Sequence, residues 1–364
     1  MVTSECTNYD ISPVYLRNTQ ENIDLLKDEF ADSPDNLFVR GSFARGDRPF
    51  GDIDISAYNP GGTYRGGTYP STFEGIPISY GQLPLEKLED YFQTCLRGTS
   101  SLMETLPIKV VDPLPLDIIE RQKAEFIATR IPDYLLFLQV EEKIAREDPG
   151  KNEKDIYYYR KREGGSKRSI SRMVWTIKGL YPELFAISNT TEALDKIEEQ
   201  KMIPNEIVNA TRVIANLVSR DFVDPTVWEQ NTTLIKEWID TVLNPCVKRY
   251  IGHHIPAGLV NATDIATDPT AGNDELERAF NYAQGEPVAH RQWLAMFALA
   301  KNPSLPKELL SAILDQHKGT FSYRNVIRNL LRNPSFPISQ IEIGDLSHDP
   351  YAQFLLKQRQ IKTS

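Results

Sequence analysis

Hydrophobic positions in the first third of the chain follow helical spacing in some segments and strand spacing in others. Ile23, Leu26 and Phe30 recur at helical intervals, which predicts a helix over 21–30. Four short apolar runs predict strands, at 36–40, 52–58, 75–82 and 106–113. Pro77 favours an edge strand or a bulge, the glycines and prolines of 59–71 predict a long turn or a flexible hairpin, and 83–96 is predicted to be a helix. This mixture predicts a small α/β unit that ends near residue 117.

The middle of the chain has helical periodicity. Pro132 suits the first turn of a helix over 131–145. A second helix is predicted over 205–221, with one apolar stripe formed by Ile207, Val208, Val213, Ile214, Leu217 and Val218. We therefore expect an all-α domain over 118–250.

The last part of the chain is repetitive. Asn-Pro-Ser occurs at 302–304 and 333–335, with Pro303 and Pro334 separated by 31 residues. Such a period is typical of helical repeats that bury a face against their neighbours. Pro306 and Pro337 are expected to open the second helix of each unit, and 346–356 to be a degenerate third copy. Residues 256–364 resemble leucine-rich-repeat-variant and similar α-repeat domains, so the fold class is α+β with a short repeat region.

Composition narrows the range of functions. The 364 residues carry a net charge of −9, which argues mildly against a general nucleic-acid binder. No apolar run reaches the roughly 20 residues of a membrane span, and the N-terminus has no secretory pattern. Three widely spaced cysteines form no metal-like pair, and together these features predict a cytoplasmic protein without a membrane partner.

The segment GSFARGDRPFGDIDIS, at 41–56, carries the candidate chemistry. Asp52 and Asp54 point to the same side of a strand, where two carboxylates repel each other unless a cation lies between them. Mg2+ or Mn2+ fits, although two solvated acids on an exposed strand would give the same pattern. Gly41 permits close backbone approach to a phosphate, and Ser42 adds a hydroxyl donor. Arg45 and Arg48 are predicted to neutralise further phosphate charge.

These residues resemble the motif of the DNA polymerase beta-type nucleotidyltransferase superfamily, in which an apolar-Gly-Ser turn precedes an apolar-flanked Asp-x-Asp. The resemblance covers about 20–117 and is closest to small stand-alone members. It implies that 14–117 is a catalytic domain with a mixed sheet. It implies that Gly41 and Ser42 grip a nucleoside triphosphate while Asp52 and Asp54 hold two Mg2+ ions. It also implies transfer of a nucleoside monophosphate, with loss of pyrophosphate, to an acceptor.

The family usually has a third acid on a later strand. Alignment of 83–96 with the helix after that strand brings Pro77 to Ser79 to this position, where no acid stands. Glu74 is the predicted substitute if the hairpin register differs, and Asp112 is a second candidate. A partner residue, or no residue at all, are the remaining alternatives.

A basic segment follows the helix at 131–145. Residues 151–172 contain eight Lys or Arg against three Asp or Glu, which fits either a solvated loop or a loop that closes over phosphate. The segment resembles in part a Lys-x-x-Gly-Gly-x-x-Arg-Asp element of protein uridylyl- and adenylyltransferases, although Ser169 replaces its aspartate. The predicted nucleotide-binding residues here are Arg162, Lys167 and Arg168.

The sequence thus predicts a metal-dependent nucleotidyltransferase, using most simply ATP. The α-repeats offer an extended surface, which favours a protein or tRNA acceptor and a possible protein partner. Three alternatives stay open: a catalytically silent nucleotide sensor or scaffold, a small-molecule transferase of the antibiotic type, and a nucleic-acid end transferase.

Overall fold

The computed structural model describes residues 20–45, 53–61, 65–73, 76–146, 173–187, 189–217, 225–317, 323–341, 352–353, 355–357 and 359. These residues combine one sheet with many helices, which confirms the predicted α+β class. The strands are β1 Asn36–Arg40, β2 Ile53–Asn59, β3 Arg65–Phe73, β4 Ile76–Pro84 and β5 Leu106–Lys109. Their order is β3-β4-β2-β1-β5, and β2 runs parallel to β4 while the other neighbours are antiparallel.

Alternation along the central strands gives the sheet two buried faces. One face packs Leu37, Val39, Ile53, Ile55 and Ile78 against α1 (Gln20–Glu29) and α2 (Gly41–Arg45). The other face packs its own apolar residues against α3 (Leu88–Thr94), α4 (Leu96–Leu102) and α5 (Leu114–Glu125); these residues are Phe38, Tyr58 and Leu83. A period of two places consecutive residues on opposite faces, so β1, β2 and β4 each contribute to both clusters.

A long helical segment links the sheet to the rest of the molecule. It runs from α5 through a π-helical turn, Phe126–Arg130, into α6 (Ile131–Arg146). Arg130 is buried, donates to the Phe92 carbonyl at 2.8 Å and pairs with Glu125. The turn therefore lets α5 cover the sheet while α6 enters the helical core.

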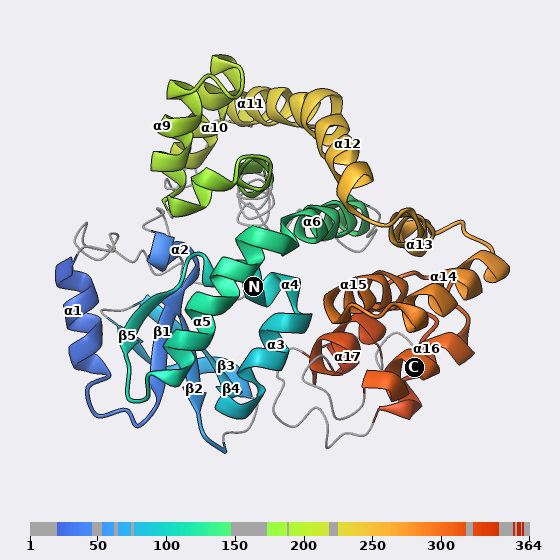
Figure 1. Ribbon diagram of the computed structural model, residues 1–364, viewed down its shortest axis with the longest axis horizontal. Helices are drawn as coiled ribbons and strands as arrows, with labels where there is room; N and C mark the ends of the chain where they lie inside the picture. The colour runs from blue at the N-terminus through green and yellow to red at the C-terminus, as the bar shows by residue number, and fades with distance from the viewer. Residues whose placement is uncertain are drawn as a thin grey trace, which may run out of the picture.

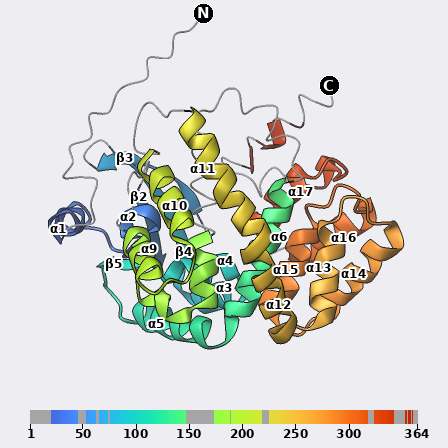
Figure 2. The same ribbon diagram turned by 90° about the horizontal axis from the view of Figure 1, so that it is seen from above.

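Helices from the middle of the chain arch over the sheet (Figure 1, Figure 2). They are 173–180, the 3-10 turn Pro182–Ala186, α9 Thr190–Glu199, α10 Asn205–Leu217, α11 Pro225–Trp238, the π-turn Ile239–Leu243 and α12 Asn244–His254. The helices predicted at 131–145 and 205–221 are thereby confirmed over the described residues. Ile207, Val208 and Ile214 of the predicted stripe are buried.

The C-terminal helices stack beside the sheet as a short array. They are α13 Ala257–Thr267, α14 Asn273–Gly285, α15 Ala289–Leu299, α16 Lys307–His317, α17 Tyr323–Arg332 and the 3-10 turn Ile338–Gln340. Helix α16 begins immediately after Pro306, as predicted, whereas the described residues after Pro337 form a 3-10 turn in place of the predicted helix.

A ladder of hydrogen bonds joins the turns of successive repeats. The Asn302 Nδ2 donates to the carbonyls of Ala266 and Asp268, and the Asn333 Nδ2 donates to those of Ala300 and Asn302. The Ser304 hydroxyl donates to Pro269 and the Ser335 hydroxyl to Pro303, which repeats the pattern one unit later. Each buried asparagine thus satisfies its own side-chain amide by donating to backbone carbonyls of the preceding repeat.

Both ends of this ladder are closed. Asp268 begins the ladder. Its Oδ1 accepts from the Thr270 N–H, as the Asn302 Oδ1 accepts from the Ser304 N–H. A carboxylate has no N–H group, so Asp268 cannot donate to an earlier turn. At the other end the Arg359 guanidinium donates to the carbonyls of Asn333 and Pro334, at 2.8 and 2.9 Å. One arginine therefore fills the positions that the asparagine and serine of a further repeat would occupy.

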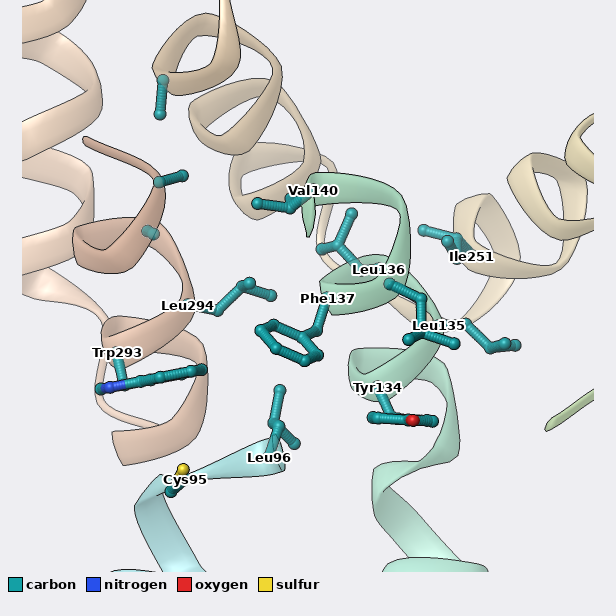
Figure 3. Close-up of a cluster of buried hydrophobic side chains, with 14 of the residues drawn as sticks. Cys95, Leu96, Tyr134, Leu135, Leu136, Phe137, Val140, Ile251, Trp293 and Leu294 are labelled. Carbon is teal, nitrogen blue, oxygen red and sulfur yellow. The ribbon is translucent and has the colours of Figure 1, made fainter. Parts of the chain in front are cut away.

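One continuous hydrophobic core extends through the helical part. In Figure 3 Phe137 of α6 points between α15 and α4, beside Trp293, Leu294 and Leu96. The ring centroids of Phe137 and Trp293 lie 5.6 Å apart. Because residues from all three predicted ranges share this cluster, the boundaries 14–117, 118–250 and 256–364 stay predictions.

Two predictions in the sheet left alternatives that the structure distinguishes. Residues 65–73, expected within a long turn or a flexible hairpin, form β3, one arm of a hairpin with β4. β4 is an interior strand, so the edge alternative for Pro77 is wrong, whereas the irregular β3–β4 register between Thr68 and Thr72, opposite Pro77, agrees with the bulge alternative. An additional repeat turn lies upstream at Asp268, whereas the predicted copy at 346–356 falls largely outside the described residues.

Across the described residues, no helix has the length and apolar character needed to cross a membrane.

The ladder predicts a pH-dependent defect for Asn333→Asp. Asn333 is 1% exposed, so a carboxylate there faces the carbonyls of Ala300 and Asn302 and cannot donate unless it is protonated. We expect a loss of about 3 kcal/mol in unfolding free energy at pH 8. Burial raises the folded-state pKa of this carboxyl, so the loss shrinks as pH falls toward 5.

The matched control is Asp268→Asn at the exposed first turn, which keeps the acceptor oxygen used by Thr270. Urea unfolding of both variants beside wild type measures the difference. Equal stability of the two variants at pH 8 would contradict a role for the ladder.

Candidate functional site

Gly41 stands at the junction of β1 and α2 with a backbone that other residues rarely adopt. Its φ is +74°, and a Cβ added there would lie 2.5 Å from the Asp54 Oδ2. A side chain there would need both a left-handed backbone and a shift of the Asp54 carboxylate, so glycine is the residue best suited to this position. The Asp54 carboxylate therefore lies directly against the backbone of the Gly41-Ser42 turn.

Strand register places three positions in one row across the sheet. Arg40 pairs with Asp54 in the antiparallel β1–β2 ladder, and Asp54 pairs with Ser79 in the parallel β2–β4 ladder. The Arg40 Nη2 lies 3.5 Å from the position that a Cβ of Gly81 would take, so its guanidinium reaches across β2 to β4. A cation and a carboxylate thus share this end of the sheet.

The same sheet face changes character along its length. Phe38 and Tyr58 are covered by the cluster that includes α3 and α5. Arg40 and Asp54, at the other end, are only partly buried. The polar end of the face is therefore partly exposed in the described structure, while the apolar end fixes the strands.

The short helix α2 is held on two sides. Phe43 and Ala44 are each 1% exposed within the cluster that also contains Val39 and Ile55. The Arg45 Nη1 lies 2.5 Å from the Glu104 Oε2, and the two side chains are 13% and 6% exposed. Arg45, predicted to bind phosphate, thus forms a buried ion pair with Glu104.

The structure brings together Gly41, Asp54 and the backbone of Ser42, whereas the side chain of Ser42 lies outside the described part. Several predicted site residues also lie outside the described residues: Asp52, Arg48, Glu74, Arg162, Lys167 and Arg168. Their assignments stay predictions.

Asp112 lies away from this site. Its backbone N–H, like that of Val111, donates to the Asn36 Oδ1 at 2.8 Å. Asn36 begins β1, at the end opposite Arg40. The Asp112 carboxylate accepts from the Leu114 N–H at the start of α5, so it stabilises a helix start and does not share the Asp54 site.

Two residues near the site were not identified from sequence. Arg40 is opposite Asp54 in the β1–β2 ladder, which the alternation of the two strands could have indicated. Glu104 is 59 residues from Arg45 and follows α4 in a turn, so no local pattern links it to α2.

Within the described ranges, no group of three or more His, Cys, Asp or Glu side chains is placed to hold a metal ion. No protein-family model, curated protein or solved structure matches the chain.

The Gly41–Asp54 contact predicts that Gly41→Ala is more damaging than Gly61→Ala. Both glycines have positive φ, but a Cβ at Gly61 would meet nothing within 4 Å. Gly61→Ala is expected to cost about 1 kcal/mol for its backbone conformation. Gly41→Ala should cost at least about 1 kcal/mol more, because the Asp54 carboxylate must also move.

Chemical denaturation of the two variants checks this difference, with Gly61→Ala as the control for backbone strain. Equal losses would mean that Asp54 does not occupy the space beside Gly41.

Proposed function

We propose that the protein is a metal-dependent nucleotidyltransferase that transfers a nucleoside monophosphate, most simply AMP from ATP, to a macromolecular acceptor. The observation that carries the proposal is the contact between the Asp54 carboxylate and the Gly41 backbone. It brings a hard anionic oxygen ligand beside a glycine turn that a phosphate can approach closely. A triphosphate and the cation that accompanies it need this combination.

The fold supports the same proposal. β1, α2 and β2 follow each other so that the glycine turn ends one strand and the carboxylate stands on its neighbour. The mixed sheet agrees with the polymerase-beta-like domain that the motif implies. Since a fold alone does not determine function, the proposal rests on the residues of the turn.

In the proposed complex, the triphosphate lies against the Gly41-Ser42 turn, and the Arg40 guanidinium contributes positive charge at the same end of the sheet. Asp54, with Asp52 as its expected partner, would hold Mg2+ or Mn2+, since carboxylate oxygens are the donors that these ions prefer. A bound ion would polarise the α-phosphate and offset the charge of the departing pyrophosphate. The partly buried setting of Asp54 strengthens such electrostatic effects.

Deprotonation of the acceptor requires another group. Ser79 occupies the position on β4 that pairs with Asp54, so the adjacent strand supplies no carboxylate in that row. Glu74 is the proposed base. Otherwise the acceptor itself is ionised, as a phosphate or carboxylate would be.

The size of the helical array favours a macromolecular acceptor over a small antibiotic-like one. The array extends from α13 to α17 beside the sheet (Figure 1). We propose a protein or a tRNA, bound between the catalytic domain at 14–117 and the helical domain at 118–250. The predicted basic residues of 151–172 would then contact phosphate groups.

Ser79 also favours a second candidate, a nucleotide sensor that binds a triphosphate without transferring it. A serine in place of a carboxylate at the β4 position that pairs with Asp54 would still leave the glycine turn able to bind phosphate. The two candidates differ in whether label from the α-phosphate becomes covalently attached to an acceptor.

Asp54→Asn is expected to lower transfer by about 100-fold or more, because it removes a charged metal ligand while keeping the side-chain shape. The assay incubates protein with each α-labelled nucleoside triphosphate, Mg2+ or Mn2+, and a cell extract separated into protein, RNA and small-molecule fractions. Asp24→Asn, an equal change of charge on the exposed surface of α1, is the control and should retain wild-type transfer.

Label in one fraction, lost only in the Asp54 variant, would support the transferase and identify the class of acceptor. Metal-dependent triphosphate binding without any label would favour the sensor.

A further inference from the structure

The ion pair between Arg45 and Glu104 joins α2 to a distant part of the chain. Its Nη1–Oε2 distance is 2.5 Å, and both side chains are largely buried. Arg45 ends a helix of five residues whose first residue is Gly41. The position of Arg45 therefore determines the position of the whole helix, including the turn that contacts Asp54.

Glu104 is itself firmly placed. Its backbone N–H donates to the Ser101 carbonyl at the end of α4, as does the hydroxyl of Thr105. Ser100, the residue before Ser101, shares a hydrogen bond with the buried Tyr134 of α6. Burial raises the pKa of this phenol. Glu104 thus extends from a framework that includes the long helical segment between the sheet and the helical core.

A buried arginine whose charge is matched by a carboxylate is poorly suited to bind a triphosphate. Withdrawing it from Glu104 would leave a buried anion without its counter-charge. Apolar packing fixes α2 through Phe43 and Ala44, and the ion pair fixes it at Arg45. The Arg45–Glu104 ion pair is therefore placed to hold α2, and with it the glycine turn, in position; we call this ion pair the brace.

We propose that Glu104 is a positioning residue that holds α2 through Arg45, and so keeps the Gly41-Ser42 turn against Asp54. Arg45 acts in this brace and is not a ligand of the triphosphate, contrary to the expectation from sequence. The effect on nucleotide binding rests on the proposed function, whereas the effect on α2 does not.

Three variants separate a brace from a phosphate ligand: Glu104→Met, Arg45→Met and the double variant. Breaking a buried pair leaves an uncompensated charge, whereas replacing both partners with apolar residues of similar size is often tolerated. Glu104→Gln, which keeps shape and one acceptor oxygen, is a milder variant should Glu104→Met fail to fold. Thermal unfolding checks the fold of each protein.

Hydrogen–deuterium exchange of the peptide covering 41–45 is the first readout, with a peptide from α15 as internal reference. We expect Glu104→Met to speed exchange in 41–45 by about tenfold or more, as loss of a charged hydrogen bond implies. The double variant should return it to within about threefold of wild type. Calorimetric titration with Mg-ATP is the second readout, and the affinity should follow the same order.

Unchanged exchange in 41–45 for both Glu104 variants would overturn the proposal. So would a double variant with wild-type exchange and stability but about tenfold weaker Mg-ATP binding, since Arg45 would then bind phosphate directly. Failure of the wild type to bind any triphosphate would instead count against the proposed function, and the exchange data would still decide the role of Glu104.

Discussion

The close contact between Gly41 and Asp54 is the constraint on which the candidate site depends. At Gly41 a backbone with φ +74° turns the chain from β1 into α2. Because glycine has no Cβ, the Asp54 carboxylate can lie 2.5 Å from the position that a Cβ would occupy. That carboxylate comes from the neighbouring strand, so the β1–β2 register must place Asp54 opposite Arg40. A shift of β2 by one residue would turn Asp54 toward the face that packs against α1 and α2. It would also bring Ile53 or Ile55 beside the Gly41 turn.

The rest of the molecule supports this contact from both sides of the sheet. Apolar packing and the Arg45–Glu104 pair hold α2, and the π-turn at Phe126–Arg130 lets one helical segment serve both the sheet and the helical core. Beyond it, buried Asn302 and Asn333 align the repeats, and Arg359 closes their last turn. An extended helical array beside the sheet offers a surface for a large acceptor, which the proposed function requires.

Sequence patterns predicted the parts of this structure that local chemistry determines. The strands at 36–40 and 52–58, the helices at 131–145 and 205–221, and the turns after the two Asn-Pro-Ser motifs all follow from periodicity or proline. Strand β3 was predicted only as part of a long turn or flexible hairpin, because glycine has a weak strand preference and the pairing with β4 is not visible in the local sequence. Glu104 could not be predicted either, since its link to Arg45 spans 59 residues and exists only once the chain is folded. Asp268 was missed because an aspartate replaces the asparagine that marks the later turns.

The identity of the leaving group tests the central claim most directly. Purified protein, Mg2+ and the cell-extract fraction that accepts label are incubated with α-labelled ATP and, in parallel, with γ-labelled ATP. The amounts of phosphate and pyrophosphate released are compared with the amount of nucleotide incorporated. The account predicts covalent label from the α-phosphate alone, with one pyrophosphate released for each nucleotide attached. Transfer of the γ-label, or release of orthophosphate without attachment, would contradict nucleotidyl transfer at the Gly41–Asp54 site.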